Sequence, residues 1–284
     1  MTIDTAIVGA RGKTVERSWT STDALLYAVA VGAGQEDASK ELAYTTENSR
    51  GVEQQALPSM ICVTATAPLP EGLEIDFTKL LHAQMGFTLD RPIPVNGSVR
   101  ATGQVDGVYD KGSGALIATS TEVVDAASGD RLAVLESGLF IRGAGGFGGE
   151  KSPSAAWSLP ERDPDDVRTL PIPTWQALVY RLTGDRNPLH SDPAFAEAAG
   201  FPAPILHGMA SYGYSARALV NSLVGEDTAR FRSMFARFTK PVFPGEVLTL
   251  QVWRTDEGAV FRTLDSAGDV VLDRGVATVF ADAA

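Results

Sequence analysis

The 284-residue sequence is poor in the residues that build disulfides and metal sites. It has one cysteine, Cys62, and three histidines. A single cysteine cannot form an internal disulfide, and its place in the run SMICVTAT predicts a buried, small apolar residue. No run approaches the roughly 20 apolar residues of a membrane span, and the N-terminal run MTIDTAIVGARGKTVERSW lacks the apolar centre of a signal peptide. We therefore expect a cytoplasmic protein with no membrane contact.

Positive charge is also scarce. The chain has 24 Lys and Arg against 35 Asp and Glu, a net charge of −11. Because an acidic surface repels phosphate backbones, we expect no nucleic-acid partner, and an anionic small molecule would need a local basic patch. With 44% hydrophobic and 21% charged residues, the composition is that of a globular protein, with enough length for about two domains.

A change of composition divides the chain in two. Residues 143–173 crowd glycine, proline and charge together, beginning GAGGFGG, and show no apolar periodicity. We interpret this segment as a linker between an N-terminal half, 1–142, and a C-terminal half, 174–284.

The two halves resemble each other. ALLYAVAVGAG, with Tyr27, is similar to ALVYRLTGDR, with Tyr180, and RPIPVNGSV from Arg91 is similar to KPVFPGEV from Lys240. Both matches are offset by about 150 residues, which predicts a tandem duplication. Chance similarity between common turn patterns is the alternative.

Each half ends in alternating apolar and polar runs separated by turn residues, which predict antiparallel meanders. In the second half an apolar stripe from about 208 to 223 predicts a long helix before the meander. The equivalent stretch of the first half, 35–60, is polar and broken by Gly51 and Pro58. We therefore expect an α+β fold in which each sheet packs on a helix and the N-terminal helix is degenerate. The missing volume could become a cavity for a large apolar group.

The run YRLTGDRNPLHSDP is the densest polar segment of the chain. It places Asp185 and His190 on a short loop whose shape Pro188 restricts, and a carboxylate beside an imidazole is suited to general acid–base catalysis. Asn187 could hold the loop through its own backbone. The alternative is structural: Asp185 as a turn residue and His190 as a partner of Asp192, itself a helix-capping residue.

A second segment, HGMASYGYSARALV, begins with His207 and Gly208 at the predicted start of the long helix. The first N–H groups of a helix have no acceptor inside it, so the Gly208 N–H could stabilise a carbonyl oxygen that gains negative charge. Gly208 could equally be an ordinary helix-start glycine, and we interpret His207 as structural.

Other catalytic motifs are not supported. GAGGFG matches GxGxxG, but no helix or βαβ unit follows it, which excludes a dinucleotide site. There is no GxSxG elbow for a serine hydrolase. Neither HExxH nor paired cysteines occur, so we expect no metal.

The runs YRLTGDRNPLHSDPAFAEAAGF and PILHGMAS closely resemble the signature of type-2, (R)-specific enoyl-CoA hydratases and MaoC-like dehydratases. YAVAVGAG, FIRGAGGFGG and the RPIP turn extend the resemblance to the two-repeat members, so it covers most of the chain. One departure is the run from Leu81 to Met85, LHAQM, where the family commonly has Leu-His-Gly-Glu-Gln. His82 is kept, but contacts from the first half to substrate are expected to differ.

The resemblance implies a double hot-dog fold and reversible addition of water to a trans-2-enoyl thioester. It places the catalytic pair on Asp185 and His190, the supporting residue on Asn187 and the N–H donor to the thioester oxygen on Gly208. We expect Asp185 to act as base and His190 as orienting partner and proton donor, although the sequence does not assign these roles. The first half has GAGQEDA where the second has GDRNPLH, so only the second half is expected to catalyse.

The expected substrate is an acyl-CoA, with no redox cofactor or metal, and the resemblance suggests a homodimer. Arg237 and Lys240 are the candidates for binding the phosphates of coenzyme A, and solvated strand residues are the alternative. The alternatives are a dehydratase of 3-hydroxyacyl carrier-protein thioesters, a thioesterase on the same fold, and a non-catalytic acyl-thioester binding protein. Acyl length, and whether the acyl group is linear or a bulky ring system, are left open.

Overall fold

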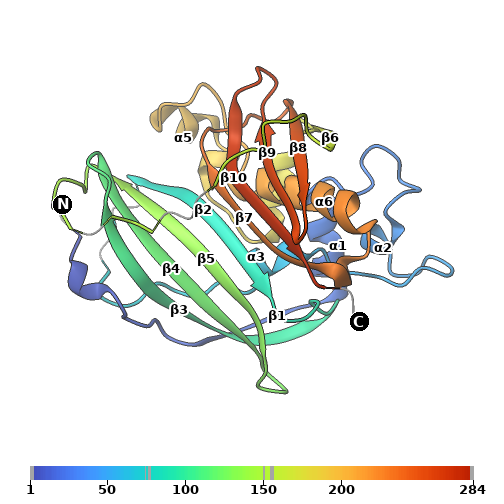
Figure 1. Ribbon diagram of the computed structural model, residues 1–284, viewed down its shortest axis with the longest axis horizontal. Helices are drawn as coiled ribbons and strands as arrows, with labels where there is room; N and C mark the ends of the chain where they lie inside the picture. Colours follow the sequence, from blue (N-terminus) through green and yellow to red (C-terminus); the bar gives the residue numbers. More distant parts are fainter. Residues whose placement is uncertain (1–2, 74, 76–77, 150, 154–156, 282–284) are drawn as a thin grey trace.

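The protein is built on one continuous antiparallel sheet, described in a computed structural model that covers residues 3–73, 75, 78–149, 151–153 and 157–281. Within these residues ten strands follow the order β1-β3-β4-β5-β2-β7-β10-β9-β8-β6 (Figure 1). The strands of the first half are β1 (Val15–Trp19), β2 (Leu80–Leu89), β3 (Gly97–Asp110), β4 (Gly114–Asp125) and β5 (Arg131–Arg142). Those of the second half are β6 (Asp166–Pro171), β7 (Phe231–Phe238), β8 (Val247–Thr255), β9 (Gly258–Leu264) and β10 (Val270–Val279).

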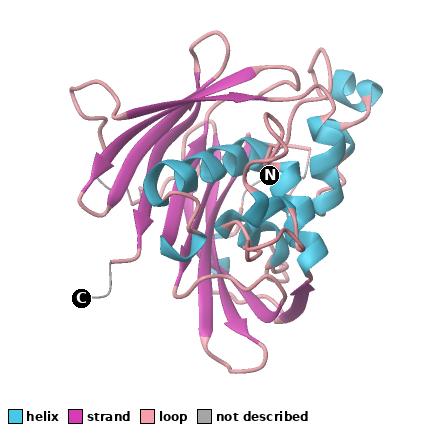
Figure 2. Ribbon diagram, turned by 90° about the vertical axis from the view of Figure 1, so that its right-hand side faces the viewer, coloured by secondary structure: helices cyan, strands magenta, loops and turns pink. Residues whose placement is uncertain are grey.

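The helices gather on one side of this sheet (Figure 2). They are α1 (Ser21–Ala30), α2 (Leu42–Thr45), α3 (Ile61–Thr64), α4 (Gln176–Tyr180), α5 (Pro193–Ala198) and α6 (Gly208–Val224). Single 3-10 turns are η1 (Thr5–Ile7), η2 (Pro58–Met60), η3 (Arg181–Thr183), η4 (Pro188–His190) and η5 (Thr228–Arg230). Among the described residues, no helix has the length and apolar character needed to cross a membrane.

The strand order shows the duplication directly. Read from its outer edge, the first half runs β1-β3-β4-β5-β2 and the second runs β6-β8-β9-β10-β7, the same sequence of equivalent strands. The halves meet where β2 pairs with β7, with Met85 opposite Ala236. Tyr27 and Tyr180, the residues that suggested the repeat, are both buried. Each lies in the helix that follows the first strand of its half: Tyr27 within α1, and Tyr180 as the last residue of α4.

β6 lies inside the segment predicted as a linker. It pairs with β8, from Asp166 opposite Val252 to Pro171 opposite Val247, and is the counterpart of β1. Half of its residues are exposed and only Leu170 is buried, because it is an edge strand, so the sequence shows no apolar alternation there. Residues 150 and 154–156 of the predicted linker lie outside the described residues.

Helix α6 is the centre of the second half. The predicted helix over 208–223 is confirmed, with its end at Val224, where Gly225 adopts the left-handed conformation typical of a helix C-terminus. Thirteen of its residues are buried, because the sheet of its own half and α1 of the other half both pack on it. Its apolar side chains join the main core, which extends through both halves.

The first half has no equivalent of α6 among its described residues. The corresponding stretch, 35–60, contains only the short helix α2 and the turn η2, and the four-residue helix α3 follows it. This agrees with the expected degenerate helix, and it leaves part of the inner face of the first sheet without a helical covering.

Candidate active site

The loop between η3 and η4 presents Asp185. Asp185 is exposed, and its Oδ1 accepts a hydrogen bond from the Asn187 N–H at 3.1 Å. Asn187 in turn is the N-cap of η4, its Oδ1 accepting from the Leu189 N–H at 3.0 Å. The expected role of Asn187 in holding the loop through the backbone is therefore present in the structure.

His190 ends the same short turn and is buried, with 8% of its surface exposed. Its Nδ1 lies 2.9 Å from the carbonyl oxygen of Ile205. Because a carbonyl can only accept, Nδ1 carries the proton, and Nε2 of the neutral ring is left as an acceptor. Burial lowers the pKa of His190, outweighing Ile205 and Asp185, which favour the charged ring. At neutral pH His190 therefore presents an unprotonated Nε2.

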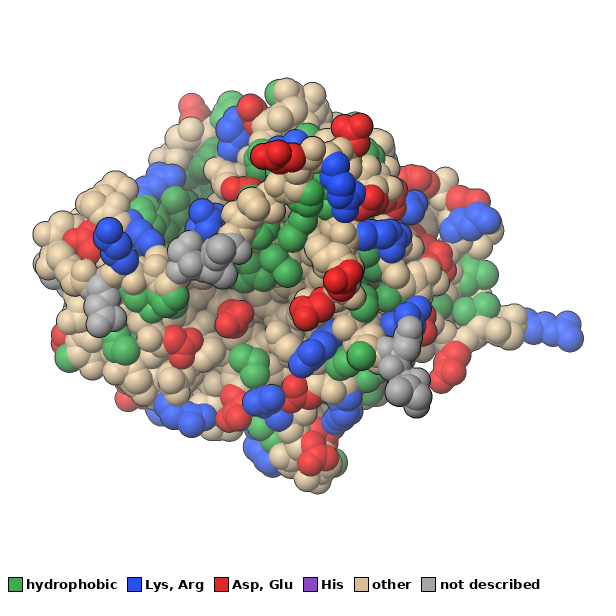
Figure 3. Space-filling model, viewed as in Figure 1, with side chains coloured by type: hydrophobic (Ala, Val, Ile, Leu, Met, Phe, Trp, Pro, Cys, Tyr) green, Lys and Arg blue, Asp and Glu red, His purple; other side chains and the backbone are tan. Residues whose placement is uncertain are grey.

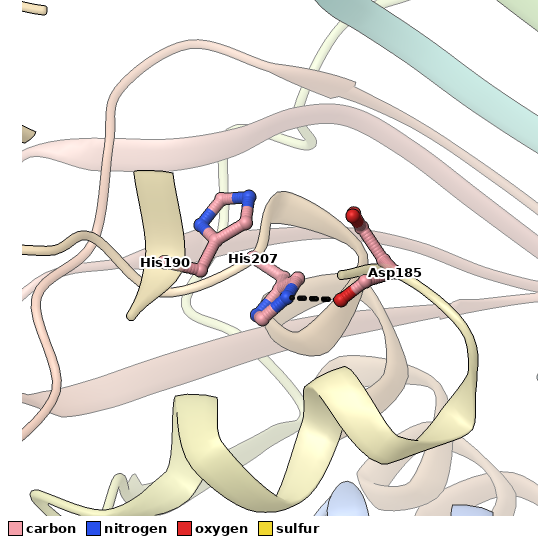
Figure 4. Close-up of side chains that lie close together, drawn as sticks. All are labelled: Asp185, His190 and His207. Atoms are coloured by element: carbon pink, nitrogen blue, oxygen red, sulfur yellow. Dashed lines mark hydrogen bonds between the residues drawn. The ribbon is translucent and has the colours of Figure 1, made fainter. Parts of the chain in front are cut away.

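His207 contacts both members of the predicted pair (Figure 4). Its ring stacks on that of His190 with 3.8 Å between centroids and an angle of 26°. Its Nε2 donates to the main-chain oxygen of Asp185 at 3.2 Å. Burial, together with the neighbouring His190, lowers the pKa of His207 to about 4, so this ring is neutral as well. Sequence reasoning identified His207 as structural but missed this double contact, which no spacing in the sequence indicates.

Of the structural alternative, the capping role of Asp192 is confirmed, but a pairing of His190 with Asp192 is not. The carboxylate of Asp192 accepts from the Ala194 and Phe195 N–H groups and caps α5. His190 bonds to Ile205 instead.

Gly208 is the first residue of α6, as predicted, and it is exposed. His207 is the N-cap and provides no side-chain capping bond, so the first N–H groups of α6 are open to a ligand. A side chain at position 208 would begin 3.3 Å from the ring of Phe238. Glycine therefore keeps the backbone accessible here.

Asp185, His190 and His207 bring polar side-chain atoms close together. One carboxylate oxygen of Asp185 and one ring nitrogen of each histidine lie within 4.8 Å of one another. A water held by Asp185 and by Nε2 of His190 would donate to both and direct a lone pair outward.

The site opens into a cavity of about 460 Å³. Asp185, Tyr180 and Met209 line it from the second half, and the first half contributes Gly103, Thr121 and other residues of its sheet together with residues of the segment 62–70. The cavity thus occupies the part of the first half that has no long helix. This agrees with the expectation that the missing helix creates a binding space.

The two candidates for binding phosphate do not join this site. Lys240 forms a surface ion pair with Asp269. Arg237 lies on β7, next to Phe238, whose ring faces Gly208, and neither cation lines the cavity. Acidic and basic side chains are interspersed over the face seen in Figure 3, and apolar side chains gather near its middle.

Comparisons with known proteins cover both halves. The MFE-2 hydratase 2 N-terminal domain family matches residues 18–143, and the MaoC like domain family matches residues 156–275. The chain is 45% identical to the 3-hydroxyacyl-thioester dehydratase Y of Mycobacterium tuberculosis, with 97% of this chain and 98% of the relative covered. It is 41% identical to the enoyl-CoA hydratase ChsH3 of the same organism, with 89% of each covered.

Solved structures agree with the architecture. A MaoC-like dehydratase from Phytophthora capsici superposes with a TM-score of 0.88 at 30% identity, covering 99% of both chains. A Mycobacterium tuberculosis protein described as a double hotdog fold superposes with a TM-score of 0.54 at 16% identity, covering 95% of this chain and 96% of the other. The double hot-dog fold expected from the sequence is confirmed.

Proposed function

The chain belongs to the family of MaoC-like dehydratases and type-2 enoyl-CoA hydratases, and from this premise we propose that it adds water reversibly to trans-2-enoyl-CoA thioesters to give (R)-3-hydroxyacyl-CoA. The observation that carries the proposal is the cluster of Asp185, His190 and His207 side-chain atoms within 4.8 Å of one another, beside the start of α6 at Gly208. The relatives named as an enoyl-CoA hydratase and a 3-hydroxyacyl-thioester dehydratase support the same chemistry in its two directions.

In the proposed reaction the water oxygen bonds to C3 of the enoyl group. One water proton passes to the Asp185–His190 pair, and one proton is delivered to C2, so that the elements of water are added across the double bond. The thioester oxygen carries the transient enolate charge, and the Gly208 N–H stabilises it by about 3–4 kcal/mol if it acts as other oxyanion donors do.

The tautomer of His190 limits its role. Nε2 is unprotonated at rest, so it cannot donate a proton until it has received one. We propose that Asp185 and Nε2 of His190 each accept one hydrogen bond from the water. If His190 donates to C2, as the sequence suggested, the proton it donates is one that it first took from the water.

We propose that no metal or redox cofactor takes part. In the stacked arrangement of His190 and His207 the ring planes are nearly parallel, so their in-plane lone pairs do not converge on one ion. Dialysis against a chelator is expected to leave hydratase activity unchanged, and loss of activity restored by a divalent metal would contradict this.

The test is the loss of enoyl-thioester absorbance with crotonyl-CoA and a long-chain 2-enoyl-CoA. Asp185→Asn and His190→Gln are expected to lower kcat by about 10²- to 10⁴-fold, because each removes an acid–base group. Asp192→Asn is the matched control: the same change of side chain seven residues away, at a helix cap outside the site. Full activity in Asp185→Asn would contradict the proposed catalytic role of Asp185.

The same assay separates the alternatives. Release of free thiol would indicate a thioesterase, and activity only on crotonyl thioesters of a carrier protein would indicate the carrier-protein dehydratase. Binding of enoyl-CoA without turnover would indicate a non-catalytic binding protein.

We also propose a homodimer located in the cytoplasm. The dimer is supported by the family resemblance, and the location by composition. Sedimentation equilibrium of the purified protein measures the mass of the assembly, and a mass of 30.0 kDa, that of one chain, would contradict the dimer.

A further inference from the structure

The cavity lies between two separate apolar clusters on the inner face of the first half's sheet. Val123 on β4 belongs to the main core, and Ile117 on the same strand belongs to a second, smaller cluster. On β3, Val99 and Val105 are divided between the clusters in the same way. The cavity is lined by residues at the positions between them. The apolar lining of the sheet is therefore interrupted where a ligand would lie.

Small residues with hydroxyl groups occupy this interruption. Thr119 and Thr121 lie on β4, with Ser137 on β5 opposite Thr119 and Gly103 on β3 opposite Thr121. A side chain at Gly103 would begin 3.1 Å from the carbonyl oxygen of Pro68 and 3.9 Å from Oγ1 of Thr121. These distances place the Thr121 hydroxyl on the cavity side of the sheet, facing the loop that covers it. We refer to Thr119, Thr121 and Ser137 as the hydroxyl row.

The hydrogen bonds of the hydroxyl row leave capacity for a ligand. Ser137 Oγ bonds to Nε2 of His82 at 3.0 Å, and Thr119 Oγ1 reaches the Ser137 carbonyl at a long 3.4 Å. Among the described residues, Thr121 Oγ1 has no hydrogen-bond partner. Tyr180, which also lines the cavity, is fully buried, and its hydroxyl likewise has no partner in the described part of the chain.

A continuous wall of contacts joins the hydroxyl row to the catalytic end. Phe238 packs beside Gly208, and its ring centroid lies 5.0 Å from that of His82. His82 bonds to Ser137, which stands opposite Met85 on β2. Burial lowers the pKa of His82 to about 4, so this part of the wall is neutral. An acyl chain whose thioester lies at Gly208 would follow this wall and bring its distal carbons to the hydroxyl row.

Resting on the proposed function, we propose that the acyl group of the substrate carries an oxygen function, a hydroxyl or a keto group, remote from the thioester, and that Thr121 and its neighbours in the hydroxyl row bind it. A plain hydrocarbon chain would displace water from the Thr121 hydroxyl and leave it unpaired, at a cost comparable with a lost hydrogen bond. An oxygen on the acyl group replaces the displaced water.

The test measures binding with ligands that cannot react. Decanoyl-CoA and its 6-, 8- and 10-hydroxy derivatives lack the 2,3-double bond, and isothermal titration calorimetry compares their affinities for the wild-type protein. The matched variants are Thr121→Val, which removes the hydroxyl at nearly constant volume, and Thr121→Ser, which keeps it. Thr102→Val is the control: its hydroxyl bonds to Thr14 and lies outside the cavity lining.

We expect at least one hydroxy derivative to bind the wild type about 3- to 10-fold more tightly than decanoyl-CoA, the effect of one net hydrogen bond. Thr121→Val should abolish this preference, whereas Thr121→Ser and Thr102→Val should keep it. Equal or weaker binding of all three derivatives, or a preference that survives Thr121→Val, overturns the inference. Failure to hydrate crotonyl-CoA would overturn the proposed function instead, because the binding comparison needs no turnover.

Discussion

At the residue scale, His207 contacts both proposed catalytic residues, Asp185 and His190. It stacks on His190 and bonds to the backbone of Asp185, so one side chain sets both a ring orientation and a loop position. It does not need to touch the substrate to do so, and we assign it as a positioning residue. Small displacements of reacting groups can cost 10²-fold in rate, which gives such a residue a measurable role.

Two variants separate the contacts of His207. His207→Phe keeps a ring to stack on His190 but loses the N–H, and His207→Asn keeps an N–H donor but loses the stacking. Each is expected to lower kcat by about 10- to 100-fold with less change in KM. In His207→Asn water reaches His190, so the pKa of His190 should rise and the acidic limb of the rate profile should move to higher pH. If both kcat and its dependence on pH were unchanged in these variants, the positioning role of His207 would be ruled out.

At the element scale, the crossing of α6 and α1 depends on Gly213. A side chain at this position would begin 2.4 Å from Cγ1 of Val31 and 2.9 Å from Oη of Tyr27. Gly213 lies inside α6, where alanine would stabilise the helix better than glycine. We infer that glycine is present because it lets the two halves approach closely.

We expect Gly213→Ala to destabilise the protein by about 1–3 kcal/mol through overpacking, despite its better helix propensity. Thermal unfolding followed by circular dichroism measures this. Val31→Ala removes the atom that the new methyl group meets, so the double variant should recover part of the loss. A Gly213→Ala protein as stable as the wild type would show that the helices can separate at little cost.

At the scale of the whole molecule, a buried ion pair joins the halves. Arg217 on α6 bonds to both carboxylate oxygens of Glu41, at 2.8 Å and 2.7 Å, and to the carbonyl oxygen of Val31. Burial alone would raise the pKa of Glu41, but Arg217, the Gly34 N–H and Asn221 hold it below its ordinary value. The pair fixes the first half's loop against the central helix of the second, and removing one partner would leave a buried charge.

The three histidines make stability depend on pH. Burial lowers the pKa of His82 and of His207 to about 4 and lowers that of His190. Between pH 6.5 and about 4 the unfolded chain binds protons that the folded protein does not, so stability falls as the pH falls through this range. For each histidine, the free energy of unfolding changes with pH by up to about 1.4 kcal/mol per pH unit.

Urea unfolding at a series of pH values tests this dependence. His82→Gln should reduce the slope by about one proton's contribution, because glutamine does not titrate. A free energy of unfolding that stays constant from pH 6.5 to pH 4.5 would contradict the lowered pKa values of these rings.

By itself, the sequence determined much of the local organisation. The helix from Gly208, the meanders, the duplication and the Asp185–His190 loop follow from apolar periodicity, turn residues and Pro188, which act over a few residues. β6 was missed because an exposed edge strand has no apolar alternation to detect. The resemblance to a known family supplied the fold name and identified a thioester oxygen as the expected partner of the Gly208 N–H.

Only the tertiary structure decided which residues from distant parts of the sequence contact these segments. The stacking of His207 on His190, the tautomer set by Ile205 and the hydroxyl row that lines the cavity depend on residues brought together by folding. The same holds for the buried ion pair between Glu41 and Arg217, which are 176 residues apart in the sequence. Periodicity indicates which face of an element is buried, but the partner that this face meets is set by how the two halves of the sheet join at β2 and β7.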